Sequence, residues 1–199
     1  MDEDELVEIA QKKGEVRGIV FCTDAEYVRR HEGEEALRGI EEETRKMGYP
    51  VNYSEMKAMD WYPIGLRAIS LLATRKVLNW DDEQVKEMGR NAPKYSLITK
   101  LMLRYFASPE TVVNRLGTYW HKHYSVGSLE GKIIDQSGIL RSGIIRLNDF
   151  KIHPILCTYL QGYFICVLSM VVGQTEKLSI EEAKCVHTGN EYHEFVLRW

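Results

Sequence analysis

Residues 153–199 decide the fold, and they have two parts. Residues 153–173 read HPILCTYLQGYFICVLSMVVG, an apolar run without Asp, Glu, Lys or Arg. Residues 179–199 read SIEEAKCVHTGNEYHEFVLRW, two strand-like segments around Gly189-Asn190. The pattern predicts a buried helix that leads into a C-terminal β-hairpin, on which the rest of the chain packs.

The segment before this helix has the alternation of a second hairpin. Residues 126–147 read VGSLEGKIIDQSGILRSGIIRL, with period-two stretches on either side of a turn at 135–138. Residues 125–199 are therefore expected to form a hairpin–helix–hairpin unit. A further strand over 15–22, centred on Ile19-Val20-Phe21, would add an edge and give a sheet of about five strands.

The first two-thirds of the chain is predominantly helical in pattern. Helical spacing or capping signals cover 34–48, 63–79, 81–106 and 108–124, and Pro93 must kink or divide the third of these. Thr23 or Asp24 can cap another helix that ends at Gly33. Residues 1–12 form a short acidic helix or a loosely held tail. The expected fold is α+β: a helical N-terminal two-thirds packed on an antiparallel sheet of about 4–5 strands, with a buried helix between two β-hairpins.

Length, charge and cysteine content limit the number of domains and the kinds of partner that the chain can have. The chain of 199 residues fits a single ligand-binding-type domain over 1–199. A net charge of −3 and scattered basic residues give no reason to expect nucleic-acid binding. The cysteines, at positions 22, 157, 166 and 185, form no CxxC pair, which favours reduced thiols and a cytoplasmic location.

Two observations argue against export and membrane insertion. The N-terminus, MDEDELVEIAQ, is acidic where a secretory signal is basic and then apolar. Residues 155–173 approach the length of a membrane span, but polar residues interrupt the run and Tyr159 and Tyr163 lie in its middle. We expect a core helix and no membrane span.

The motif inventory excludes several kinds of chemistry. The chain has no GxGxxG, no GxxxxGK[ST] loop, no HExxH and no GxSxG. The carboxylate run Glu41-Glu42-Glu43 is typical of a solvated helix face. No catalytic residue is assigned, and a non-enzymatic protein is expected.

Cysteine and histidine around the C-terminal turn suggest a metal site. Cys185 and His193 bracket the turn, and thiolate and imidazole are ligands that structural zinc selects. If Gly189-Asn190 form a two-residue turn, the two side chains lie on opposite faces. If a three-residue loop from Thr188 with a bulge connects the strands, they face each other. Further ligands would come from Cys157 or Cys166, and the alternative is a buried thiol beside a surface histidine.

Haem is a second possibility, since His121 and His123 lie among aromatic residues at the end of a predicted helix. Cations at a helix C-terminus also favour the helix dipole, which needs no cofactor.

The helical region carries many large rings with polar tips. Such rings either fill a solid core or line an apolar pocket between the helices and the sheet. The residues assigned to such a pocket are Trp61, Tyr62, Leu66, Tyr95, Tyr105, Phe106, Tyr119, Trp120 and Tyr163.

The C-terminal unit resembles the end of the 4-vinyl reductase domain family. That ending has a strand with a cysteine, a Gly-centred turn and a strand reading Cys-x-Phe; Cys185, Gly189 and Phe195 match, and His193 replaces the second cysteine. The family is similar in fold to haem nitric-oxide-binding domains and to small TRAPP-type trafficking subunits. Residues 18–40 and 60–72 also resemble a bacterial paralogue group of this superfamily.

The resemblance implies an α+β fold with a cavity between helices and sheet, a small hydrophobic ligand, a regulatory role and a tendency to form homodimers. The Tyr-x-Ser-x-Arg propionate clamp of the haem family is absent. The leading expectation is a non-enzymatic sensor domain for a small apolar ligand. A haem-based nitric-oxide sensor and a reductase-type enzyme or zinc-stabilised module are the alternatives.

Overall fold

The computed structural model describes residues 2–95, 108–135, 141–172 and 178–199. Its main sheet is antiparallel and has the strand order β3-β4-β6-β5. The strands are β3 (Ser128–Asp135), β4 (Ser142–Asn148), β5 (Ser179–Lys184) and β6 (His193–Arg198). The two hairpin strand pairs and the α+β class predicted from the sequence are confirmed.

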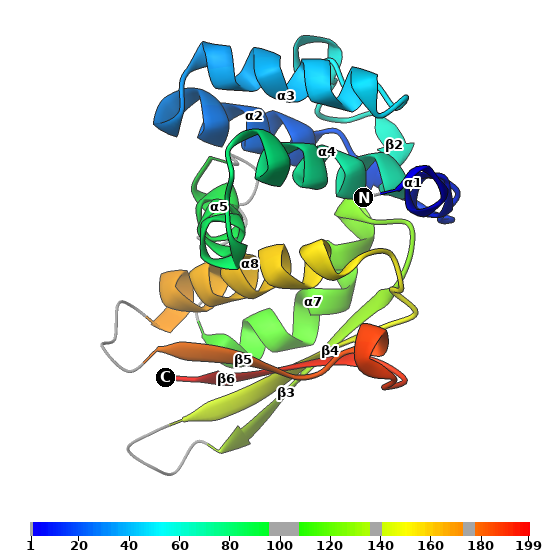
Figure 1. Cartoon of the computed structure of the whole chain (residues 1–199). Helices are drawn as coiled ribbons and strands as arrows, with labels where there is room; N and C mark the ends of the chain where they lie inside the picture. Colours follow the sequence, from blue (N-terminus) through cyan, green and yellow to red (C-terminus); the bar gives the residue numbers. More distant parts are fainter. Residues whose placement is uncertain (1, 96–107, 136–140, 173–177) are drawn as a thin grey trace.

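The apolar stretch forms α8 (Pro154–Val172), which lies across the inner face of the sheet and beneath the helical layer (Figure 1). On its other side it packs most extensively against α5 (Asp82–Tyr95), and the two helices cross where both have a glycine in place of a larger residue. A Cβ added at Gly162 would lie 1.8 Å from the Lys86 carbonyl oxygen, and one at Gly89 would lie 2.0 Å from the Tyr159 carbonyl oxygen. This backbone approach requires glycine on both sides of the crossing.

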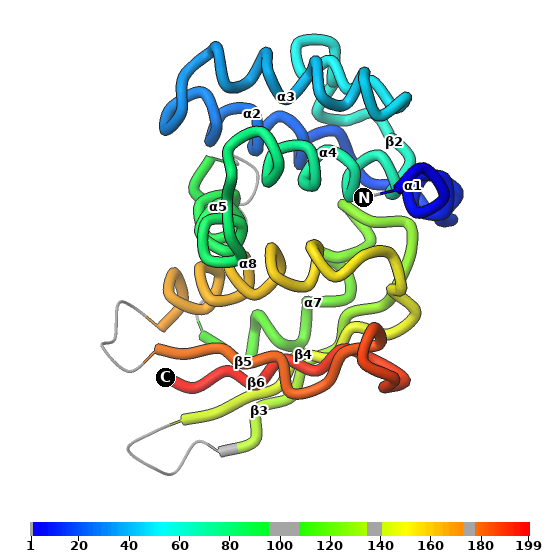
Figure 2. Tube along the Cα trace, viewed as in Figure 1, coloured from blue at the N-terminus to red at the C-terminus, as the bar shows by residue number. Residues whose placement is uncertain are grey.

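The remaining helices lie above α8 and beside it, as the trace in Figure 2 makes clear. They are α1 (Glu3–Ala10), α2 (Ile19–His31), α3 (Glu34–Lys46), α4 (Ile64–Val77) and α7 (Pro109–His123). The expected Ser cap of α7 is confirmed, because the Ser108 hydroxyl accepts a hydrogen bond from the Thr111 backbone N–H. α7 packs against β3 and forms, with α8, the cover of the sheet's inner face.

The strand expected over residues 15–22 is confirmed only over Glu15–Arg17, and its expected place at the edge of the main sheet is wrong. β1 (Glu15–Arg17) is short and pairs with β2 (Trp61–Pro63) in a separate two-stranded sheet. Helix α2 begins at Ile19. The Gly18 and Ile19 amides, which have no partner within the helix, donate to the carbonyls of Asp60 and Ala58. Phe21, Ala25 and Val28 are buried with a helical period, so the apolar run belongs to a helix face.

The expected cap at Thr23 or Asp24 is wrong for the same reason. Both residues lie inside α2, and its N-cap is Gly18. The Asp24 side chain is buried against Arg67 of α4.

The C-terminal turn follows neither of the two expected geometries. A 3-10 helix (Val186–Thr188) and Gly189 in the left-handed region connect β5 to β6. The Cys185 carbonyl oxygen accepts hydrogen bonds from the Thr188 and Asn190 backbone amides and closes the loop. A bulge between Glu182 and Lys184 shifts the register before this loop begins.

Helix α8 is long and apolar enough to cross a membrane by length and composition, but these properties also fit a core helix. It packs on α5, α4, α7 and β5, and 44% of its most apolar window is buried. These contacts support the reading as a core helix.

Candidate functional site

Four side chains from α8, β5, the final turn and β6 converge on one point. Cys157 Sγ lies 3.6 Å from His193 Nδ1 and 4.0 Å from Cys185 Sγ. The His193 Nδ1 atom is also 2.9 Å from Glu182 Oε1. The ligand atoms of all four residues lie within 4.8 Å of one another. Around a tetrahedral zinc with ordinary Zn–N and Zn–S bonds, ligand atoms are about 3.3–3.8 Å apart.

A hydrogen bond outside the cluster orients the histidine. His193 Nε2 lies 2.8 Å from the Phe150 carbonyl oxygen, which can only accept, so Nε2 carries a proton. Nδ1 then faces the Glu182 carboxylate and the two thiols. Two acceptors at 2.9 Å need a proton or a cation between them, and a metal ion at the centre of the cluster would satisfy both.

The thiols are neutral without a metal. Burial raises the pKa of the Cys157 thiol well above its usual range and also raises the pKa of the Cys185 thiol. A thiol that binds a divalent cation gives up its proton, so ion binding and thiol deprotonation would occur together here. The mixed sulfur, nitrogen and oxygen donor set suits zinc.

The sequence prediction named three members of this cluster and missed one. Cys157, Cys185 and His193 come together, but Cys166 lies elsewhere on α8, where its carbonyl accepts from the Ser169 hydroxyl. Glu182 was missed, although its position three residues before Cys185 was visible in the sequence. The convergence depends on the bulge and the 3-10 turn, and neither has a local sequence signal strong enough to predict it.

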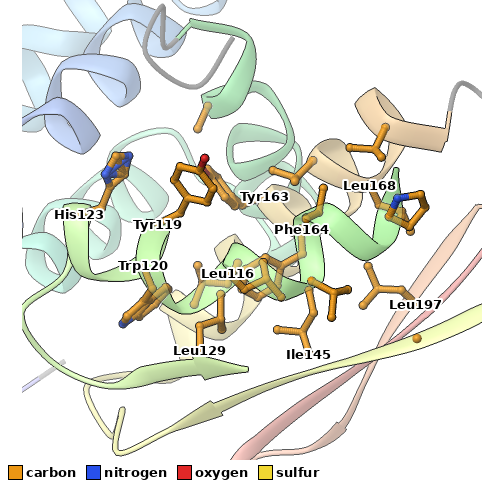
Figure 3. Close-up of a pocket in the computed structure, with 18 of the residues that line it drawn as sticks. Leu116, Tyr119, Trp120, His123, Leu129, Ile145, Tyr163, Phe164, Leu168 and Leu197 are labelled. Atoms are coloured by element: carbon orange, nitrogen blue, oxygen red, sulfur yellow. The ribbon is translucent and has the colours of Figure 1, made fainter. Parts of the chain in front are cut away.

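The second feature is an apolar cavity of about 140 Å³ between α7, α8 and the sheet (Figure 3). Leu116, Tyr119 and Trp120 of α7 form one wall, and Tyr163 and Phe164 of α8 form another. Leu129, Ile145 and Leu197 close it from the sheet, and Ile19, Val20 and Thr23 close it from α2. An engineered apolar cavity of about 150 Å³ stays dry and binds benzene, so the space is on the scale of a small apolar ligand.

The residues assigned to a pocket from sequence separate into three groups. Tyr119, Trp120 and Tyr163 line the cavity. Four others are absent from the cavity lining and contact other residues. The Arg17 guanidinium lies over the Trp61 ring, and the Tyr62 hydroxyl accepts a hydrogen bond from the Lys57 amide. Leu66 packs against the hydrophobic core, and the Tyr95 ring contacts the Tyr27 ring. Tyr105 and Phe106 lie outside the described residues. Nothing in the sequence indicated that Leu116, Phe164 and the sheet residues line a cavity, because their apolar pattern is that of any buried core.

The two candidate haem histidines differ in position. His121 is exposed, whereas His123 borders the cavity. The His123 Nδ1 atom is buried and has no hydrogen-bond partner among the described residues. Burial lowers the pKa of the His123 imidazole, with Arg17 and Lys122 adding to the effect, so its neutral form is favoured.

Comparisons with solved structures identify the fold. An H-NOX protein from S. oneidensis in the Fe(II) ligation state superposes with a TM-score of 0.66 at 14% identity, over 91% of this chain and 94% of that chain. The same organism's H-NOX protein in the Fe(II)NO ligation state superposes with a TM-score of 0.57 at 17% identity, over 91% of this chain and 97% of that chain. The unliganded Fe(II) H-NOX protein from K. algicida superposes with a TM-score of 0.60 at 12% identity, over 91% of this chain and 95% of that chain.

The chain has the H-NOX fold. This confirms the predicted likeness to haem nitric-oxide-binding domains at the level of fold. No family model and no curated protein sequence matches the chain, so the 4-vinyl reductase part of the resemblance has no support.

The haem of such domains fits the residues of this chain only in part. His123 offers one buried, neutral nitrogen at the cavity wall. The cavity of about 140 Å³ is on the scale of a single ring, and a macrocycle of four pyrroles would need the walls to move apart. The Tyr-x-Ser-x-Arg clamp is absent from the sequence.

Proposed function

We propose that this chain is a non-enzymatic sensor domain that binds a small apolar ligand between α7, α8 and the inner face of the sheet. The observation that carries the proposal is the apolar cavity, which is walled by side chains from α2, α7, α8 and three strands. A ligand there would contact both the helical layer and the sheet. Its arrival would therefore bias how these two parts pack, which is what a sensor requires.

Haem is the second candidate, and the structural matches favour it over an unspecified ligand. The side chain that supports it is His123, whose Nδ1 could ligate the iron and would supply the axial imidazole. Bound haem would provide the gas-binding centre. The cavity volume and the missing clamp favour the smaller ligand.

The metal cluster supports a structural role beside the ligand site. Zinc held by Cys157, Glu182, Cys185 and His193 would join α8 to both strands of the final hairpin. A closed set of four protein ligands leaves no open position for catalysis, which agrees with a module that does not catalyse. Homodimer formation and a cytoplasmic location stay predictions.

Thermal shift measurements test the ligand proposal. Ligands that bind only the folded state raise Tm in proportion to the logarithm of their concentration above Kd. We expect small apolar molecules to raise the Tm of the wild type but not of Leu116→Phe, which fills the cavity. The matched control is Leu66→Phe, on α4 and away from the cavity. A Soret band after haem reconstitution, retained in Leu66→Phe and lost in His123→Leu, would favour haem instead.

A further inference from the structure

The cavity is elongated. Its lining residues on α7 run from Pro109 to His123, the full length of a helix of about 21 Å. On α8 they run from Tyr159 to Val171. The space of about 140 Å³ therefore extends along α7 and along α8 from Tyr159 to Val171, and it forms an elongated channel. A chain-shaped molecule fits such a channel better than a compact ring or a flat macrocycle.

Most polar atoms on the lining are already bonded. The Thr23 hydroxyl donates to the Val20 carbonyl, the Trp120 indole N–H donates to the Val126 carbonyl, and the Tyr159 hydroxyl donates to Asp24. Tyr119 and Tyr163 also have partners. The polar groups of Thr23, Trp120 and Tyr159 therefore need no hydrogen bond from a ligand.

Two ring nitrogens on the described lining are buried and have no partner, His123 Nδ1 and Trp199 Nε1. A buried polar atom without a hydrogen bond destabilises the fold, so each one marks a position where a ligand group that bonds to it would be stabilising. The indole nitrogen only donates, and the neutral imidazole offers either a donor or an acceptor.

The two nitrogens lie at opposite ends of the channel. A Cβ added at Gly143 would lie 3.5 Å from the Trp199 ring, and Gly143 pairs with Ile133 near the end of β3. α7 runs antiparallel to β3, because Val113 lies against Gly131 while Gly117 lies against Leu129, nearer the start of the strand. His123, the last residue of α7, is therefore at the other end from Trp199.

We infer that the ligand is an elongated, unbranched apolar molecule with a hydrogen-bonding group at each end. Trp199 binds an acceptor at one end, and His123 binds the group at the other. This inference rests on the proposed function and specifies its ligand class. It also makes His123 and Trp199 the specificity-determining residues of an otherwise apolar channel.

The test uses linear α,ω-alkanediols of six to twelve carbons and the matching 1-alkanols as probes, titrated calorimetrically into the full chain. We expect affinity to peak at one diol length, where the diol binds about threefold to tenfold more tightly than its 1-alkanol. Trp199→Phe and His123→Leu should each remove this advantage and leave 1-alkanol binding within about threefold of the wild type.

Two variants keep the test decisive. His123→Gln retains a hydrogen-bonding side chain and should restore part of the advantage. If His123→Leu does not fold, Trp199→Phe carries the comparison, because it removes one N–H and keeps an aromatic ring. Diols that bind no more tightly than 1-alkanols at any length would overturn the two-ended ligand while leaving the sensor proposal intact. Wild-type protein that binds neither probe series, nor any compact apolar molecule, would overturn both.

Discussion

Asp24 of α2 and Arg67 of α4 form an ion pair that the fold removes from water. The Arg67 side chain is 0% exposed and the Asp24 side chain 2%. Tyr159 of α8 donates its hydroxyl to Asp24 Oδ1 at 2.9 Å, and the guanidinium lies 4.5 Å from the centre of the Tyr159 ring. Because Tyr159 also lines the cavity, the pair connects the helical layer to the cavity wall.

Removing the negative charge should strongly destabilise the fold. Asp24→Asn leaves the Arg67 guanidinium buried without a counter-charge, and we expect a loss of about 3–5 kcal/mol in the free energy of unfolding. Urea denaturation at pH 7 measures it. Arg30→Gln breaks an exposed pair with Glu26 and should cost less than about 1 kcal/mol. A loss for Asp24→Asn as small as this control would mean that the pair is solvated.

The double variant Asp24→Leu with Arg67→Met tests whether the buried ion pair costs more in desolvation than it contributes to stability. Replacing both charges with apolar groups removes the desolvation penalty, so it should cost less than Asp24→Asn alone. The same urea series gives the comparison. A double variant less stable than the single variant would indicate that the ion pair itself stabilises the native state.

Zinc should bind at the C-terminal cluster with a stoichiometry of one. We expect elemental analysis to find zinc in the wild type and in Cys166→Ala, and to find it lost in Cys185→Ala, because Cys166 lies outside the cluster. Chelation of the wild type should lower Tm by about 5–10 °C. Zinc retained in full by Cys185→Ala would exclude this site.

Stability should fall in mild acid partly because of His123. Burial places the pKa of the folded-state imidazole below its unfolded value of about 6.5, so protonation favours the unfolded chain as pH falls through that value. His123→Gln should lose less stability between pH 7.5 and 5.5 than the wild type does. The urea midpoint at each pH reports it, and His121→Gln, at an exposed position, should behave like the wild type. Equal pH slopes in all three proteins would contradict this assignment.

Much of the fold was predictable because its signals are local. Period-two alternation, the Ser108 cap and the uncharged run over 153–173 each predicted an element that the structure confirms. The run over 19–21 misled, because three apolar residues fit a strand or a helix and only the tertiary bonds of Gly18 and Ile19 decide between them.

The sites were less predictable than the fold, since they depend on distant residues. The metal cluster forms only because the fold brings Cys157 of α8 next to Cys185 and His193. Glu182 lies beside them because of a β-bulge, and no residue in the sequence predicts that bulge. The cavity depends on how α7 and α8 pack over the sheet. From sequence, Leu116 and Phe164 look the same whether they fill a core or line a channel.

Native mass spectrometry of the purified full chain, with the wild type beside Leu116→Phe, shows whether the cavity holds a small organic ligand. We expect a wild-type species that carries one non-covalent organic molecule smaller than haem, and we expect Leu116→Phe to lose this molecule with zinc still bound. A wild type that carries haem, or an organic adduct that Leu116→Phe keeps in full, would contradict this expectation.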